Sequence, residues 1–289
     1  MSSPQLNTGP HPDRSETPRP APGPRGVPTA RPAAGGAAPE RSVELGRPAV
    51  PAGPDQPDWL TDLAEALSAA RPDDLSRARA PAAGDARPAA VLMVLADGPN
   101  GADILLIQRA PDLRSHGGQP AFPGGATDPT DVSPAATALR EAHEEVGLDP
   151  ECVRVVATGP ALYLPPSHFL VTPVLAWWHT PCPVAAMDPN ETSSVARVPV
   201  ATLADPANRL LVHHARTGYL GPAFRAHDMF IWGFTGGLLD ALLRMGGWER
   251  PWLPAEQVEA PAPVMSVPTA VPTAVPTASR APEPTGDSE

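Results

Sequence analysis

FPGGATDPTDVSPAATALREAHEEVGL, residues 122–148, is the stretch from which the fold of this chain can be read. A glycine loop opens it, and a run with helical spacing follows. Ser133 suits the N-cap of that run, and Pro134 suits the first helical position, where a backbone N–H has no partner in any case. Gly147 suits the C-terminal cap because glycine adopts positive φ without steric cost. The sequence therefore predicts a helix from Pro134 to about Val146.

Three carboxylates fall within five residues on this predicted helix. Glu141, Glu144 and Glu145 stand at i, i+3 and i+4, so they share one face. Like charges at this spacing repel each other by roughly a few tenths of a kcal/mol per pair. A hard divalent cation with oxygen ligands would remove that penalty. The alternative is a solvated acidic face, but the glycine loop and the apolar residues on the opposite face argue against it.

This segment resembles the Nudix box of the Nudix hydrolases, G-x5-E-x7-R-E-U-x-E-E-x-G-U, where U is aliphatic. Gly125 matches the opening glycine, and Arg140–Leu148 match the whole second half. The first half departs from the pattern. Asp131 stands at the glutamate position, and eight residues instead of seven then precede the arginine. The insertion leaves the helix face intact and the role of Asp131 open.

The residues just before the box sharpen the resemblance. Residues 105–125, LLIQRAPDLRSHGGQPAFPGG, are similar to the extra motif of the coenzyme A pyrophosphatase branch, LLTxR-S/A-x3-R-x3-G-x3-FPGG, with Ile107 replacing the threonine. The resemblance implies hydrolysis of coenzyme A or acyl-coenzyme A at its pyrophosphate, giving 3′,5′-ADP and 4′-phosphopantetheine or its acyl form. Another nucleoside diphosphate derivative, such as ADP-ribose or a dinucleotide, is the alternative substrate. A non-catalytic Nudix-fold binding module is a further alternative, which the intact acids of the box argue against.

The resemblance also implies the metal site and the catalytic base. Glu141, Glu144 and Glu145, together with the backbone carbonyl of Gly125, would bind Mg²⁺ or Mn²⁺. The bound ion would neutralise phosphoryl oxygens and activate a water molecule. The general base would be Glu141 or a carboxylate outside the box, for which Glu191 is the candidate.

Arginines and glycines complete the implied site. Arg140 would orient a glutamate through a bidentate pair. Arg109 and Arg114 are the candidates for binding substrate phosphates, because planar guanidinium groups suit phosphate oxygens. Ordinary surface salt bridges are the alternative for both. Gly118 and Gly124 would let the backbone approach the substrate closely.

Proline marks both ends of the chain. Of 43 prolines, 22 fall in residues 1–57 and 254–289. Such segments bury too little apolar surface to offset the entropy of ordering, so we predict disordered, Pro/Ala-rich tails there. Residues 58–253 then form one domain of ordinary size.

Charge and cysteine usage restrict the partners. The net charge of −11 argues against non-specific nucleic-acid binding, which needs a basic surface. Cys152 and Cys182, the only cysteines, are too few for a disulfide framework or a zinc site. The sequence has neither a run of 18 apolar residues nor an apolar leader at its start. We therefore expect a cytoplasmic protein with a small-molecule substrate and no membrane partner, and a homodimer stays open.

Periodicity predicts the remaining elements. Apolar residues recur with helical spacing in residues 58–70 and 230–244, which predicts a helix in each segment. Short apolar runs bounded by turn residues predict strands at 91–96, 103–108, 153–158, 170–178 and 194–198. Residues 71–87 read as a linker. Strands around the carboxylate helix indicate an α+β fold in αβα layers with a mixed β-sheet, and the resemblance implies the Nudix sandwich.

Overall fold

The computed structural model describes residues 53, 55–76, 86–113, 116–165, 167–215, 218–253 and 257–261. All of them belong to one unit of the chain, residues 45–289. Most of the predicted N-terminal tail, the C-terminal tail from residue 262 onward, and Arg114 lie outside the described residues.

A mixed sheet of eight strands forms the centre of the fold. The strands are β1 (Arg87–Gly98), β2 (Gly101–Arg109), β3 (Pro120–Ala121), β4 (Gly124–Ala126), β5 (Arg154–Thr158), β6 (Leu162–Leu164), β7 (Phe169–Trp177) and β8 (Thr192–Pro199). Their order is β3-β2-β1-β7-β5, with β4 beside β1, β6 beside β7, and β8 beside β2. The long strands β1 and β7 run parallel, while β2 pairs with β1 in the antiparallel direction.

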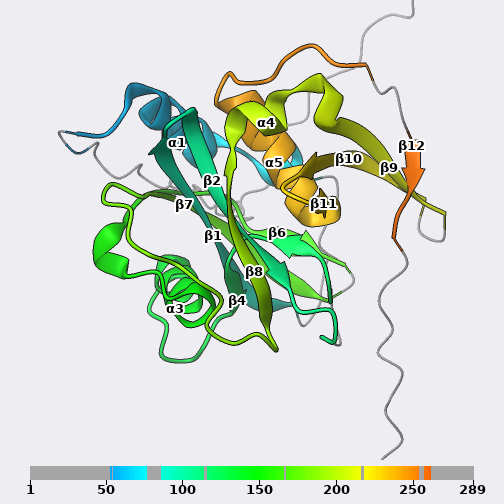
Figure 1. The fold of residues 1–289 in the computed structure, drawn as a ribbon. Helices are drawn as coiled ribbons and strands as arrows, with labels where there is room; N and C mark the ends of the chain where they lie inside the picture. The colour runs from blue at the N-terminus through cyan, green and yellow to red at the C-terminus, as the bar shows by residue number, and fades with distance from the viewer. Residues whose placement is uncertain are drawn as a thin grey trace, which may run out of the picture. The chain divides into compact units, whose positions relative to one another are not determined.

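Helices cover both faces of this sheet (Figure 1). They are α1 (Asp58–Ala69), α2 (Pro72–Leu75), α3 (Pro134–Val146), α4 (Val200–Ala204) and α5 (Gly233–Met245). Alternate residues of β1 divide between the two faces: Leu92 and Val94 pack with α3, whereas Met93 and Leu95 pack with α1 and α5. This arrangement confirms the predicted αβα sandwich with a mixed sheet.

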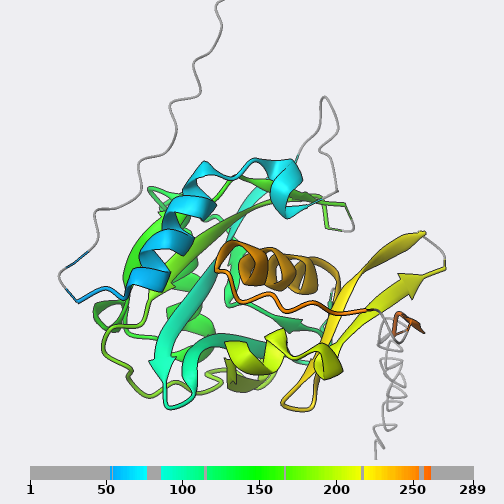
Figure 2. The ribbon, with the colours of Figure 1, turned by 90° about the horizontal axis from the view of Figure 1, so that it is seen from above.

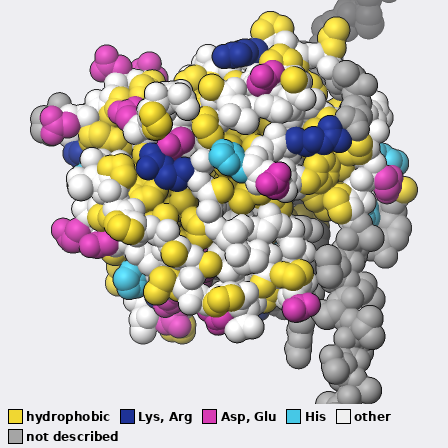
Figure 3. Space-filling model, viewed as in Figure 1, with side chains coloured by type: hydrophobic (Ala, Val, Ile, Leu, Met, Phe, Trp, Pro, Cys, Tyr) yellow, Lys and Arg dark blue, Asp and Glu magenta, His cyan; other side chains and the backbone are white. Residues whose placement is uncertain are grey.

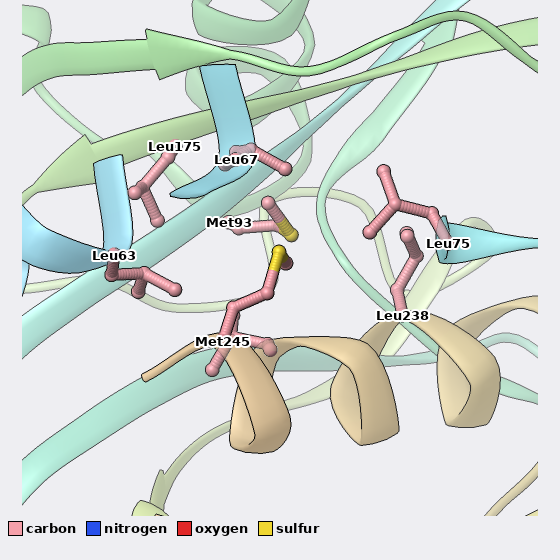
Figure 4. Close-up of a pocket in the computed structure, with 8 residues that line it drawn as sticks. Leu63, Leu67, Leu75, Met93, Leu175, Leu238 and Met245 are labelled. Atoms are coloured by element: carbon pink, nitrogen blue, oxygen red, sulfur yellow. The ribbon is translucent and has the colours of Figure 1, made fainter. Parts of the chain in front are cut away.

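Helices α1, α2 and α5 lie on one side of the large sheet (Figure 2). Leucine and methionine side chains fill the space between these helices and the sheet. Figure 4 shows that they point toward one another, from Leu63, Leu67, Leu75, Met93, Leu175, Leu238 and Met245. The packing leaves no room for a water molecule and lies on the sheet face opposite α3. Leu75 is buried here on the short helix α2, so the predicted linker at residues 71–87 carries a structural element.

A second, smaller sheet was not predicted. Its strands run in the order β11 (Met229–Ile231), β10 (Tyr219–Ala226), β9 (Arg209–His214) and β12 (Gln257–Glu259). Because Met229–Ile231 pairs with β10, the helix predicted from residue 230 begins at residue 233 instead. Regular structure also continues beyond the predicted domain end at residue 253. β12 lies beyond that residue and pairs in parallel with β9, and Ala260 beside it is buried.

The surface in Figure 3 bears on the expected partners. Arginine side chains in this view stand apart from one another, among acidic and apolar side chains, so this face presents no continuous basic stripe. None of the helices in the described parts of the chain is both long and apolar enough to cross a membrane.

Candidate active site

The carboxylate helix α3 begins and ends where its capping residues predict. The Ser133 hydroxyl accepts a hydrogen bond from the backbone N–H of Ala136 at 3.1 Å, and Pro134 follows it. Gly147 closes the helix with a φ of 68°, and its N–H donates to the carbonyl of His143 at 2.9 Å. The two caps therefore set where the helix begins and ends, and all three glutamates lie between them.

The three glutamates occupy different environments. The Glu145 side chain is 7% exposed, that of Glu141 is 17% exposed, and that of Glu144 is 56% exposed. Burial raises the pKa of Glu145 to about 7, and burial also raises the pKa of Glu141. A carboxylate of this kind is costly to keep charged without a positive partner. The helix thus presents two desolvated acids and one at the edge of the solvent.

The glycine loop before the helix lies directly against the two buried acids. The Gly124 N–H donates to Oε2 of Glu145 at 3.0 Å. A Cβ atom on Gly125 would fall 2.5–2.7 Å from the carboxylate atoms of Glu141. Any larger residue at position 125 would therefore push that carboxylate away. Gly124 itself has a φ of 156° and lies against the backbone of β1, which also requires glycine.

Arg140 contacts three carboxylates of the site. Its guanidinium lies 3.0 Å from Oε1 of Glu141 and 2.9 Å from Oε2 of Glu144. It also donates to Asp131, from Nε to Oδ1 at 3.1 Å and from Nη2 to Oδ2 at 3.0 Å. A further hydrogen bond joins Nη2 to the carbonyl of Ala126 at 3.0 Å. Arg140 thus orients carboxylates and ties the box loop to α3, and Asp131 is its bidentate partner.

Arg109 and Glu191 lie near the most buried acid. Nη1 of Arg109 is 3.4 Å from Oε1 of Glu145, and the Arg109 side chain is 27% exposed. Glu191 is exposed, and its carbonyl accepts the N–H of Ala110 at 2.8 Å, which fixes it beside the end of β2. The charge of Glu191 is among the causes that raise the pKa of Glu145, after burial. Arg109 therefore contacts this carboxylate directly, whereas Glu191 acts on it through its negative charge.

The loop that carries Gly118 is fastened to β2. Gly118, with a φ of 69°, donates its N–H to the carbonyl of Ala110 at 3.2 Å. Its own carbonyl accepts a hydrogen bond from the side-chain amide of Gln108. The N–H of Arg109 donates to the carbonyl of Gln119 at 3.1 Å. Gln108 was missed as a supporting residue, since a variable position of the motif gives no signal in one sequence.

A second missed contribution comes from the segment after β7. The N–H of Met187 donates to the carbonyl of Glu145 at 3.1 Å, and that of Ala185 donates to Val146, also at 3.1 Å. These bonds satisfy carbonyls at the last turn of α3, where no helical partner remains. The segment that leads to Glu191 is thereby attached to the carboxylate helix.

The two cysteines also meet. Both are free thiols, and a hydrogen bond between Cys152 and Cys182 raises the pKa of Cys152 to about 11. Both side chains pack against the apolar cluster beneath α3. They are neighbours in space despite their separation in the sequence, although two thiols remain too few for a zinc site.

The chemistry of these residues fits a hard divalent cation. Glu141 and Glu145 are desolvated oxygen donors, and the loop backbone lies against them. In the described parts of the chain, however, no three His, Cys, Asp or Glu side chains converge closely enough to hold a metal. Arg140 and Arg109 supply the positive charge at the glutamates instead.

Comparisons of the sequence with known proteins identify the family of this chain. The NUDIX domain family matches residues 86–219. "Uncharacterized Nudix hydrolase NudL" of Escherichia coli O7:K1 is 38% identical over 166 residues, which cover 54% of this chain and 81% of that protein. "Probable nudix hydrolase C6G9.05" of Schizosaccharomyces pombe is 33% identical over 156 residues, 54% of each chain. The solved Nudix hydrolase RenU of M. smegmatis aligns at 23% identity and a TM-score of 0.42, over 56% of this chain and 86% of its own. The chain belongs to the Nudix hydrolase family.

Proposed function

We propose that this chain hydrolyses the pyrophosphate bond of coenzyme A or acyl-coenzyme A in the presence of Mg²⁺ or Mn²⁺. The products would be 3′,5′-ADP and 4′-phosphopantetheine, or its acyl form. The observation that carries the proposal is the hydrogen bond from Gly124 to Glu145. It joins the coenzyme A-type motif at residues 105–125 to the box helix, so that both meet at one carboxylate.

The metal would be held by Glu141, Glu144 and Glu145, with the carbonyl of Gly125. When bound, the cation supplies positive charge to the phosphoryl oxygens and lowers the pKa of the attacking water. Arg140 orients Glu141 and Glu144, which it contacts directly. The Gly124 N–H fixes the orientation of Glu145.

The remaining residues act on the water and the substrate. Attack of water on one phosphorus breaks the bridging P–O bond, and each product keeps one of the two phosphates. The proton of the water passes to a carboxylate, either Glu141 or Glu191. Arg109 binds a substrate phosphate, and Arg114 stays a predicted second phosphate ligand. Gly118 and Gly124 keep the loop backbone close to the substrate.

The proposal includes the partner of the chain and its compartment. The partner is a small molecule, with no role for nucleic acid or membrane, and the site of action is the cytoplasm. Every residue invoked comes from one chain, so the proposed chemistry would proceed in a monomer or in a homodimer.

Product analysis with a substrate panel tests the proposal. The full chain is incubated with Mg²⁺ or Mn²⁺ and with coenzyme A, acetyl-coenzyme A, 3′-dephospho-coenzyme A, ADP-ribose or NADH. We expect faster cleavage of the two substrates that carry the 3′-phosphate, which yield 3′,5′-ADP, than of the other three, which yield AMP. A preference for ADP-ribose or NADH would favour the alternative substrate class. Binding of coenzyme A without product under any divalent metal would favour the non-catalytic module.

A further inference from the structure

Arg109 has two possible partners in this site. In the structure its Nη1 lies 3.4 Å from Oε1 of Glu145. It also stands at a fixed position of the motif through which the proposed substrate is bound. One guanidinium beside a buried carboxylate cannot give its full charge to that carboxylate and to a phosphate at the same time.

The charge balance around Glu145 shows why it needs Arg109. Its carboxylate is 7% exposed, and its other oxygen is satisfied by the neutral N–H of Gly124. Arg140 is engaged with Asp131, Glu141 and Glu144. Among the ion pairs of the described residues, the contact from Arg109 is the one that places a cation on Glu145.

We propose that Arg109 exchanges partners during the binding cycle. It is the counter-ion of Glu145 while no divalent cation is bound, and it moves to a substrate phosphate once the cation takes over the charge of Glu145. This inference rests on the proposed function, because it requires a cation at the box glutamates and a phosphate in the substrate.

The exchange makes cation and substrate binding cooperative. In the substrate-free protein, Arg109 competes with the cation for Glu145 and weakens cation binding. A substrate phosphate draws Arg109 away and removes that competition. By linkage, the cation must raise the affinity for the phosphate by the same factor.

Isothermal titration with Mn²⁺ alone, on the full chain without substrate, tests the competition. We expect Arg109→Ala and Arg109→Gln to bind Mn²⁺ about tenfold more tightly than the wild type, the lower end of the range for a charged hydrogen bond. Arg87→Ala is the matched control. It removes the same charge from an exposed residue that stands over the ring of Phe169 at 4.3 Å, and it should change the Mn²⁺ affinity less than twofold.

A second arm tests the transfer to phosphate. The probe is 3′,5′-ADP, titrated with and without Mg²⁺ into the wild type and the two Arg109 variants. In the wild type, Mg²⁺ should strengthen binding of the probe. The variants should bind it more weakly and show a smaller effect of Mg²⁺. In the wild type, the Nε–Hε resonance of Arg109 should shift when Mg²⁺ is added without the probe.

The outcomes separate the inference from the proposed function. Unchanged or weaker Mn²⁺ binding in both folded Arg109 variants would overturn the exchange while leaving the metal-dependent hydrolase standing. Equally tighter Mn²⁺ binding in Arg87→Ala would also overturn it, because the loss of one positive charge would then be enough to explain the effect. A wild-type chain that binds neither Mn²⁺ nor Mg²⁺ would contradict the proposed function, and the inference with it.

Discussion

The guanidinium of Arg140 and the carboxylate of Asp131 form a two-pronged pair, with Nε to Oδ1 at 3.1 Å and Nη2 to Oδ2 at 3.0 Å. The same guanidinium contacts Glu141 and Glu144. The extra residue in the box loop therefore leaves the arginine with an acidic partner on the loop side. This answers the question that the sequence left open about Asp131: it holds Arg140, through which it positions the glutamates.

Replacing Asp131 should weaken catalysis through that pair. Without this partner, Arg140 keeps more of its charge for Glu141 and Glu144 and competes with the cation for them. We expect Asp131→Ala to lower kcat about tenfold and to weaken Mn²⁺ binding by a similar factor. Steady-state kinetics and Mn²⁺ titration measure both. If Mn²⁺ affinity were unchanged, Asp131 would have no role in positioning the ligands.

The hydrogen bond to Asp131 from Arg140 also lowers the pKa of that aspartate to about 2. A carboxyl whose pKa is depressed in the folded state contributes stability above its ordinary value, and that contribution is lost as the pH falls toward 2. The effect of Asp131→Ala on the melting temperature should thus be constant from pH 5 to pH 8 and shrink below pH 4. Thermal unfolding across this range checks it.

Among the proposed metal ligands, Glu145 is the one whose loss should cost most activity. Glu145→Gln keeps the size of the side chain and its acceptor for the Gly124 N–H but removes the charge. We expect turnover to fall by on the order of 10² or more, with the fold intact. Glu65→Gln, which changes an exposed residue of α1, is the matched control. Near-wild-type turnover in a folded Glu145→Gln protein would remove Glu145 from the metal site.

The same substitution should stabilise the metal-free protein. Because burial raises the pKa of Glu145 to about 7, the folded state binds this proton more tightly than the unfolded chain does. Stability is therefore lost as the pH rises from about 4.5 to about 7. At pH 8 in EDTA, Glu145→Gln should unfold with a free energy roughly 1–3 kcal/mol above that of the wild type, and the gain should vanish near pH 4. A gain that persisted unchanged at pH 4 would point to a cause other than ionisation.

Substrate discrimination tests the role of the arginines. If Arg109 holds the 3′-phosphate, coenzyme A should be cleaved roughly 10- to 150-fold better than 3′-dephospho-coenzyme A, the range expected for one charged hydrogen bond. Arg109→Ala should shrink that ratio by slowing coenzyme A and leaving the dephospho form little changed. Values of kcat/KM for both substrates measure it. A ratio that stays the same in the variant would assign the 3′-phosphate to another residue.

Truncation distinguishes the C-terminal strand from the tail beyond it. A chain that ends after residue 261 keeps β12 and its pairing with β9. A chain that ends after residue 253 loses them and exposes the apolar residues around Ala260. We expect the first truncation to melt within a degree or two of the full chain and the second to melt several degrees lower. Equal melting temperatures would show that β12 adds nothing to stability.

The carboxylate helix could be predicted from Pro134 to about Val146 because its signals are local. Ser133, Pro134 and Gly147 cap a single helix, and the spacing of the glutamates follows from its period. The unequal burial of Glu141, Glu144 and Glu145 could not be predicted, since it depends on the loop that folds back over two of them.

The second sheet escaped prediction because its strands lack a clear pattern. β10 carries Pro222 in its interior, and proline within a run argues against a strand. β12 spans only Gln257–Glu259 and shows no apolar alternation, so only its pairing with β9 identifies it. The contact between Arg109 and Glu145 joins residues 36 positions apart, which no local pattern can indicate.

The most direct test of the central claim is the hydrolysis of coenzyme A in ¹⁸O-labelled water with Mg²⁺, followed by mass spectrometry of the products. The wild-type chain should form 3′,5′-ADP and 4′-phosphopantetheine, with one ¹⁸O atom in one of the two new phosphates, and Glu145→Gln should form neither above background. If the wild-type chain left coenzyme A intact with every divalent metal, or cleaved ADP-ribose in its place, the account of this site as a coenzyme A pyrophosphatase would be contradicted.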